Sequence, residues 1–210
     1  MNFDSVIHQL EHQLSLPLPG EPAQLMMAPY QRASREEALK GNPSPKLSAV
    51  LALIYPVQGK AFTTLMLRNS YKGVHSAQVS FPGGKMENSD TDLQHTALRE
   101  AEEELAIPQT EVNVMGQLTE VYIPPSGFLV TPYVGYLNER PDFLPNEHEV
   151  QEIIETPLSM LMDDAIIKNA TIPVLNGKMT IKAPYFDIRG KMVWGATAMM
   201  LSELKSLLAS

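Results

Sequence analysis

Three acidic side chains share one face of an expected helix in the middle of the chain. At about 100° per residue, Glu103 and Glu104 fall on either side of Glu100, whereas Glu102 points elsewhere. Like charges at this spacing destabilise a helix, and near its C-terminal end the helix dipole disfavours them further. A divalent cation such as Mg²⁺ relieves the repulsion, because it takes oxygen ligands from a few carboxylates. The pattern indicates a metal site, the alternative being a solvated acidic face.

The helix that carries these carboxylates is expected over residues 92–106, ending before Pro108. An apolar stripe beside the acidic face is suited to docking on a sheet. The stripe comprises Ala97, Leu98, Ala101 and Leu105. Arg99 lies one residue before Glu100 and four before Glu103, so its guanidinium is expected to hold a carboxylate in one orientation.

A glycine pair, Gly83 and Gly84, stands upstream of this helix. Glycine permits close backbone approach and positive φ. An amide or a carbonyl of the pair is therefore expected to meet a metal ion or a phosphate. A plain tight turn is the alternative for the pair taken alone.

The segment Arg99 to Ile107, REAEEELAI, resembles the second half of the signature of the Nudix hydrolases. That signature reads glycine, five residues, glutamate, seven residues, then Arg-Glu-apolar-any-Glu-Glu-any-Gly-apolar. In this chain Ala106 replaces the last glycine. Asp90 stands where the first glutamate belongs, with one extra residue before Arg99. The resemblance implies an α/β/α sandwich (α/β, α+β class) with a mixed β-sheet, and a metal-dependent diphosphatase.

The resemblance also assigns roles within the signature. It implies that Glu103 and Glu104 are metal ligands and that Glu100 is a ligand or the base that activates water. Arg99 would orient Glu100, and the backbone at Gly84 would contribute to the metal site. The implied ions are Mg²⁺ or Mn²⁺.

Residues outside the helix are further candidates. In similar proteins a glutamate from a distant loop joins the metal ions or acts as base, which suggests Glu149, alternatively a surface-loop glutamate. Arg68 and Lys85 are expected to pair with the substrate diphosphate or to form structural salt bridges. His75 is expected to contact a phosphate or to be structural, and Gln78 is placed with these residues as substrate-binding.

Several segments between residues 47 and 205 resemble the coenzyme A diphosphatase branch of these hydrolases. They are Arg68, His75–Lys85, Thr131–Val134, Asn146–Val150, Pro157–Leu158 and Val193–Ala198. The branch has an arginine and a glycine where this chain has Gly73 and Ala77. The resemblance implies a nucleotide substrate, coenzyme A or an acyl derivative, cleaved to 3′,5′-ADP and 4′-phosphopantetheine. Hydrolysis of ADP-ribose, a dinucleotide or a modified nucleotide, a non-catalytic nucleotide-binding regulator, and a plain acidic interaction module are the alternatives.

The composition suits one α/β domain with a short appendage. The chain has 210 residues, 44% of them hydrophobic, and a formal net charge of −8, which argues against nucleic acid or an anionic membrane as partner. It has no cysteine, no signal-peptide pattern and no apolar stretch long enough to span a membrane. A cytoplasmic protein is expected. A homodimer is common among similar proteins, although no sequence feature indicates one.

The remaining patterns predict strands in the middle of the chain and helices around them. Strands are expected at residues 47–57, 62–67, 78–81, 112–122, 128–137 and 150–155, and a hairpin of 171–175 and 178–182 around Asn176–Gly177. Further helices are expected at 3–14, 32–39, 157–163 and, as an amphipathic closing helix, 196–208. Residues 1–45 are expected to form an extension packed on a catalytic domain of residues 46–210.

Overall fold

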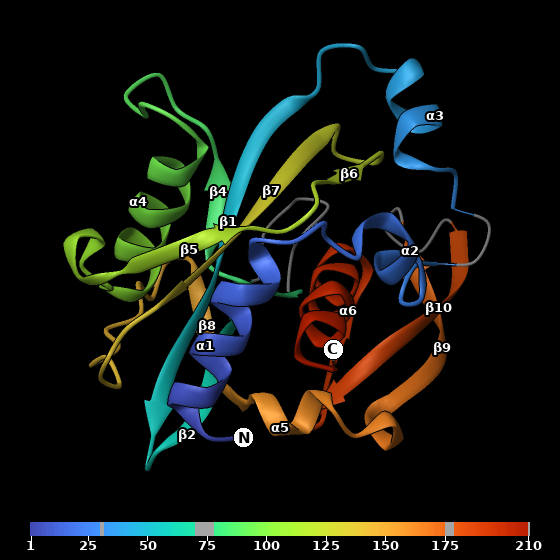
Figure 1. Ribbon diagram of the computed structural model, residues 1–210. Helices are drawn as coiled ribbons and strands as arrows, with labels where there is room; N and C mark the ends of the chain where they lie inside the picture. The colour runs from blue at the N-terminus through green and yellow to red at the C-terminus, as the bar shows by residue number, and fades with distance from the viewer. Residues whose placement is uncertain (30–31, 70–77, 175–178, 210) are drawn as a thin grey trace.

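The computed structural model describes residues 1–29, 32–69, 78–174 and 179–209 (Figure 1). Two sheets and a set of helices make up this part of the chain. The larger sheet contains β1 (Lys46–Val57), β2 (Lys60–Arg68), β3 (Val79–Ser80), β4 (Gly83–Lys85), β5 (Asn113–Gln117), β6 (Val121–Ile123), β7 (Phe128–Tyr136) and β8 (Val150–Pro157). The smaller sheet contains β9 (Ile167–Val174), β10 (Met179–Ile188) and β11 (Lys191–Trp194).

The helices are α1 (Phe3–Leu14), α2 (Gly20–Leu25), α3 (Arg35–Lys40), α4 (Leu93–Leu105), α5 (Leu158–Leu161) and α6 (Gly195–Ala209), with 3₁₀ turns η1 (Gln109–Glu111) and η2 (Asp164–Ile166). Figure 1 shows α4 on one side of the larger sheet and α6 on the other. The predicted sandwich with a mixed sheet is confirmed. None of the helices in the described ranges is both long and apolar enough to cross a bilayer.

Strand β1 organises the larger sheet because both of its faces are buried. It runs parallel to β7 and antiparallel to β2 and β4. Leu51 and Leu53 join the apolar cluster beneath α4, whereas Ala52 and Ile54 join the cluster around α1 and α6. This explains why β1 is a continuous apolar run rather than an alternating one.

Two strands differ from the sequence prediction. The strand expected at residues 112–122 divides into β5 and β6, because the amide of Thr119 donates to the carboxylate of Glu203 instead of a strand partner. Gly83 begins β4, a short strand that was not predicted. A side chain at Gly83 would place its Cβ 2.4 Å from the carbonyl oxygen of Ala49, so only glycine lets β4 pair this closely with β1.

The helix predictions also need correction. α2 lies in a segment where no helix was predicted, and α3 begins at Arg35 because Ser34 and Glu37 form a capping box there. Helix α6 is not amphipathic, since α2 packs on its outer face and consecutive residues from Thr197 to Leu204 are all buried. The predicted hairpin is present as β9 and β10, with Val174 opposite Met179, and its Asn176–Gly177 turn lies outside the described residues.

A buried carboxylate on α6 ties the N-terminal segment to the sheet. Glu203 accepts hydrogen bonds from the Gly20 amide at 3.1 Å, the Gln24 side-chain amide at 2.7 Å and the Thr119 hydroxyl at 2.7 Å. Helix α1 packs against α6, β5 and β2. On these contacts we propose that residues 1–45 form an extension that folds against the domain of residues 46–210.

Candidate active site

Helix α4 presents the acidic face because its other side is anchored on β1. Asp92 caps the first turn by accepting from the amide of His95 at 2.8 Å. Ala97 and Ala101 are fully buried against the larger sheet. Ala106 ends the helix in the left-handed conformation, with φ 58°, which explains why the signature has glycine at this position.

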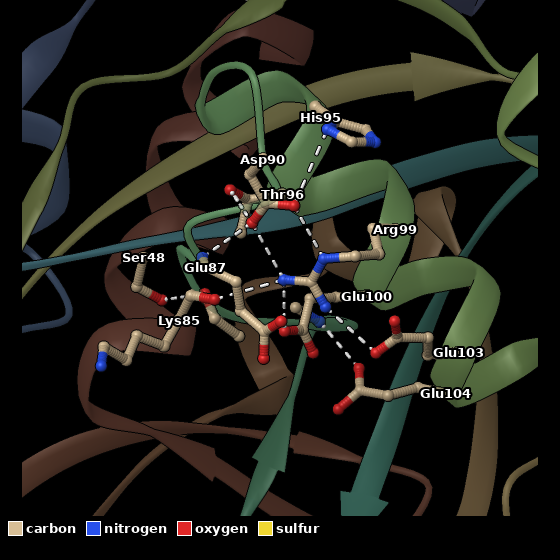
Figure 2. A network of polar contacts seen from close by, with 12 residues as sticks. Ser48, Lys85, Glu87, Asp90, His95, Thr96, Arg99, Glu100, Glu103 and Glu104 are labelled. Atoms are coloured by element: carbon tan, nitrogen blue, oxygen red, sulfur yellow. Dashed lines mark hydrogen bonds and ion pairs between the residues drawn. The ribbon is translucent and has the colours of Figure 1, made fainter.

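Arg99 lies at the centre of the carboxylates, as Figure 2 shows. Its Nε and Nη2 atoms donate to both oxygens of Asp90, at 2.8 and 3.1 Å. Nη1 donates to Glu103 at 3.0 Å, and Nη2 lies 3.0 Å from Glu100 Oε1. Nη2 also donates to the carbonyl of Lys85 at 3.3 Å. One arginine therefore connects the helix, the loop before it and β4.

Asp90 fixes this arginine from the loop between β4 and α4. Its side chain has no exposed surface, and it accepts from the Glu87 amide and the Thr96 hydroxyl, each at 2.9 Å. The Arg99 guanidinium, more than any other group, holds the pKa of Asp90 well below its usual range. The aspartate at the position of the first signature glutamate thus has a structural role, since it holds Arg99 in place. The contact of Thr96 with Asp90 was not predicted, because no sequence pattern distinguishes this threonine from others in the chain.

Replacing Asp90 with asparagine is expected to lower the free energy of unfolding by about 3 kcal/mol, because Arg99 would lose a buried ionic partner. A lowered folded-state pKa stabilises the protein above the unfolded pKa of about 3.9. The difference between wild type and variant should therefore be constant near pH 7 and shrink as the pH falls below about 4. Urea unfolding across this pH range measures it. Asp164→Asn, at an exposed ion pair, is the control, and an equal loss in both variants would contradict the prediction.

Glu100 is pressed against the glycine pair. A Cβ atom at Gly84 would lie 2.4 Å from the carboxyl carbon of Glu100, so glycine leaves the space that this carboxylate fills. Burial raises the pKa of Glu100, while Arg99 opposes the shift. The hydroxyl of Ser48 donates to the Gly84 carbonyl at 2.6 Å. The backbone atom predicted to contribute to a metal site is therefore held in a fixed direction.

Glu104 is the deepest of the carboxylates, with no exposed side-chain surface. Its Oε2 accepts from the amide of Gly83 at 2.8 Å, and its Oε1 lies 2.9 Å from Nη1 of Arg68. Burial raises the pKa of Glu104 to about 8, although Arg68 and the Gly83 amide oppose the shift. A cation placed beside this carboxylate would stabilise its charged form.

Glu149 reaches the same place from a different part of the chain. Its backbone carbonyl accepts from the amide of Asn69 at 2.8 Å, which joins its loop to the end of β2. Its carboxylate lies 4.0 Å from Nη2 of Arg68 and is 48% exposed. The structure therefore brings a half-exposed carboxylate next to the buried Glu104 through the arginine between them.

Most of the predicted site residues converge. Those that lie together are Arg68, Gly84, Arg99, Glu100, Glu103, Glu104 and Glu149. The Lys85 side chain is exposed and points away from the carboxylates (Figure 2). Gln78 is half-buried, and its carbonyl accepts from the backbone amide of Arg68. His75, Gly73 and Ala77 lie outside the described residues.

The carboxylates are paired with arginines instead of facing one another. Glu100 and Glu103 contact Arg99, and Glu104 contacts Arg68. Accordingly, within the described ranges no three acidic or histidine side chains are gathered around one point in the manner of a preformed metal site. The sequence did not predict this arrangement, since the ion pair between Arg68 and Glu104 joins distant segments.

Comparison with known proteins identifies relatives that match most of the chain, including the site. A family model described as NUDIX domain matches residues 45–173. The Nudix hydrolase NudL of Yersinia enterocolitica is 36% identical over 155 residues, which cover 73% of this chain and 78% of that protein. The residues matched by the family model include the glycine pair, α4 and the loop that carries Glu149.

Two solved structures share the fold at low sequence identity. The Caenorhabditis elegans Ap4A hydrolase in a binary complex has a TM-score of 0.52 and 19% identity, covering 78% of this chain and 98% of that one. A Nudix hydrolase of M. smegmatis, RenU, has a TM-score of 0.54 and 16% identity, covering 79% and 86%. These similarities extend the agreement from the signature to the arrangement of the strands and helices.

Proposed function

The chain belongs to the Nudix family of hydrolases, and from that premise we propose that it cleaves the diphosphate linkage of coenzyme A or an acyl-coenzyme A. The products are 3′,5′-ADP and 4′-phosphopantetheine. The observation that carries the chemistry is that Glu100 and Glu104 lie against the glycine pair, while Arg99 joins Glu103 to Glu100. The coenzyme A substrate rests on the resemblance of the segments between residues 47 and 205.

We propose Mg²⁺ or Mn²⁺ as the cofactor, and two features of the site fit such an ion. Oε1 of Glu104 is buried and accepts no hydrogen bond from the described residues. The space at Gly84, which a Cβ would fill, lets the backbone approach the carboxylate of Glu100. Glu100, Glu103, Glu104 and the Gly84 carbonyl would hold the ion, all through the hard oxygen atoms that these ions prefer. When bound, it neutralises charge on the phosphoryl oxygens and lowers the pKa of water.

The protein side chains divide the remaining work. Glu100 is 13% exposed and held by Arg99, which suits a ligand with one fixed orientation. Glu149 is half exposed, which suits a general base that takes the proton from attacking water. The water oxygen forms a bond to phosphorus while the bridging phosphorus–oxygen bond breaks, and the electron pair leaves on the departing phosphate.

Basic and polar groups are proposed to bind the anionic substrate. Arg68 presents a planar guanidinium that suits phosphate oxygens. Lys85, Gln78 and His75 are proposed to contact the substrate from β4 and the segment before β3. The guanidinium of Arg68 places positive charge locally at the site of a chain whose formal net charge is −8. A homodimer, a cytoplasmic location and the absence of nucleic-acid or membrane partners stay predictions.

The test is to incubate the protein with coenzyme A or with ADP-ribose, with and without Mn²⁺, and to identify the products by mass spectrometry. Metal-dependent release of 3′,5′-ADP and 4′-phosphopantetheine is expected. Cleavage of ADP-ribose alone would refute the coenzyme A substrate and keep the hydrolase. If neither compound is cleaved, a panel of dinucleotides and modified nucleotides follows, and no turnover of any of them would favour a nucleotide-binding regulator.

A further inference from the structure

Arg68 occupies a position among oxygen atoms that a divalent ion would also favour. Its Nη1 lies 2.9 Å from Glu104 Oε1 and donates to the Gly83 carbonyl at 3.3 Å. Its Nη2 lies 4.0 Å from Glu149. These oxygens come from α4, from the glycine pair and from the loop before β8. A single cationic side chain therefore contacts three of the segments that build the active site.

The contact between Arg68 and Glu104 is electrostatic rather than a well-directed hydrogen bond. Although the two charged atoms are 2.9 Å apart, Oε1 of Glu104 accepts no hydrogen bond from any residue in the described ranges. Oε2, in contrast, is satisfied by the Gly83 amide at 2.8 Å. In the ionised carboxylate, Oε1 thus has its charge balanced by Arg68 without accepting a directed hydrogen bond.

We propose that Arg68 is an internal counter-cation, which neutralises Glu104 while the site is free of metal and is displaced from it when a divalent ion binds. This inference rests on the metal-dependent function proposed above. A guanidinium and a divalent ion on the same buried oxygen repel each other strongly, because little solvent screens them. Metal binding therefore weakens the contact between Arg68 and Glu104. Once displaced, the guanidinium is free to bind a substrate phosphate, which couples metal binding to substrate binding.

Removing the charge of Arg68 has two effects, and both favour the metal-bound form over the metal-free form. Without metal, the buried Glu104 would lack a cation, so the metal-free protein becomes less stable. With metal, the competing cation is absent, so the ion binds more tightly. The Arg68→Met variant is therefore expected to have a lower thermal midpoint than wild type in EDTA, and to regain it when Mn²⁺ is added. Its dissociation constant for Mn²⁺ is expected to fall at least about fivefold.

The experiment measures Mn²⁺ binding by calorimetry and thermal unfolding in EDTA and in Mn²⁺, without substrate, on the full chain. Arg140→Met is the matched control, because Arg140 pairs with Glu155, with Nη2 and Oε1 2.8 Å apart, outside the site. The Arg140→Met substitution should change the thermal midpoint by the same amount in EDTA and in Mn²⁺. Arg68→Gln, also neutral, replaces the methionine variant if that one does not fold, and should show the same tightening.

The outcomes separate this inference from the proposed function. If wild type binds Mn²⁺ and Glu104→Gln abolishes the binding, but the neutral Arg68 variants bind the ion equally or more weakly, Arg68 orients Glu104 and the counter-cation inference is wrong. If wild type binds no Mn²⁺, the metal-dependent function fails and this inference fails with it. Tighter binding in both neutral variants, absent in Arg140→Met, supports the inference.

Discussion

Replacing Glu104 with glutamine is expected to lower kcat by about a hundredfold or more, since a bound metal ion contributes several kcal/mol to the transition state and each 1.4 kcal/mol is tenfold in rate. Glutamine has the size of glutamate but no negative charge. The Gly83 amide still finds an oxygen acceptor, so the local backbone should be kept. What is lost is the buried carboxylate that would hold the metal ion.

Two measurements distinguish this effect from misfolding. The first is the rate at saturating substrate over a range of Mn²⁺ concentrations. The second is the thermal midpoint, which should rise with Mn²⁺ in wild type and not in the variant. Glu102→Gln is the matched control, because Glu102 lies on the same helix but points away and accepts from Gln109 at 2.6 Å. A Glu104→Gln enzyme that keeps more than about a tenth of the wild-type rate would contradict the assigned role.

Replacing Gly84 with alanine is expected to have a comparable effect on rate through a steric cause. The new Cβ would lie 2.4 Å from Cδ of Glu100 and 2.5 Å from both of its oxygens, so the carboxylate must move. Because it is the end of a flexible side chain, it can move without unfolding the protein. A displacement of about 1 Å in a catalytic group costs roughly a hundredfold in rate.

The expected signature of Gly84→Ala is a large loss of kcat with a small loss of stability. Steady-state rates and urea unfolding of the same preparation give both quantities. Gly41→Ala serves as control, because a Cβ at Gly41 would meet only the Ala38 carbonyl oxygen at 3.7 Å and its φ of −83° suits alanine. An active Gly84→Ala enzyme would show that Glu100 tolerates displacement and is not a ligand.

Local patterns predicted much of the site, because a helix fixes the relative directions of its side chains. The spacing of Glu100, Glu103 and Glu104 and the apolar stripe beside them sufficed to predict α4 and its acidic face. The glycine pair was expected to meet a metal ion or a phosphate, which stays a prediction, and the structure places Glu100 against Gly84. These features depend on residues close together in the chain.

Contacts between distant segments could not be predicted in the same way. The ion pair of Arg68 with Glu104 depends on how β2 and α4 lie across the sheet. The division of the strand at residues 112–122 depends on Glu203. Helix α2, in a segment where no helix was predicted, packs against α6. In each case the deciding partner is far away in sequence, and periodicity carries no information about it.

The hydrogen bonds of Glu203 have a consequence for the order in which the chain is made. Gly20 and Gln24 are synthesised early, whereas the carboxylate that accepts from both is synthesised after every strand of the two sheets. During translation α2 must therefore wait for its partner until α6 emerges from the ribosome, whereas α1 can already contact β2 and β5. Docking of α2 is expected to be the last step of folding, and the nascent chain is open to chaperones until then.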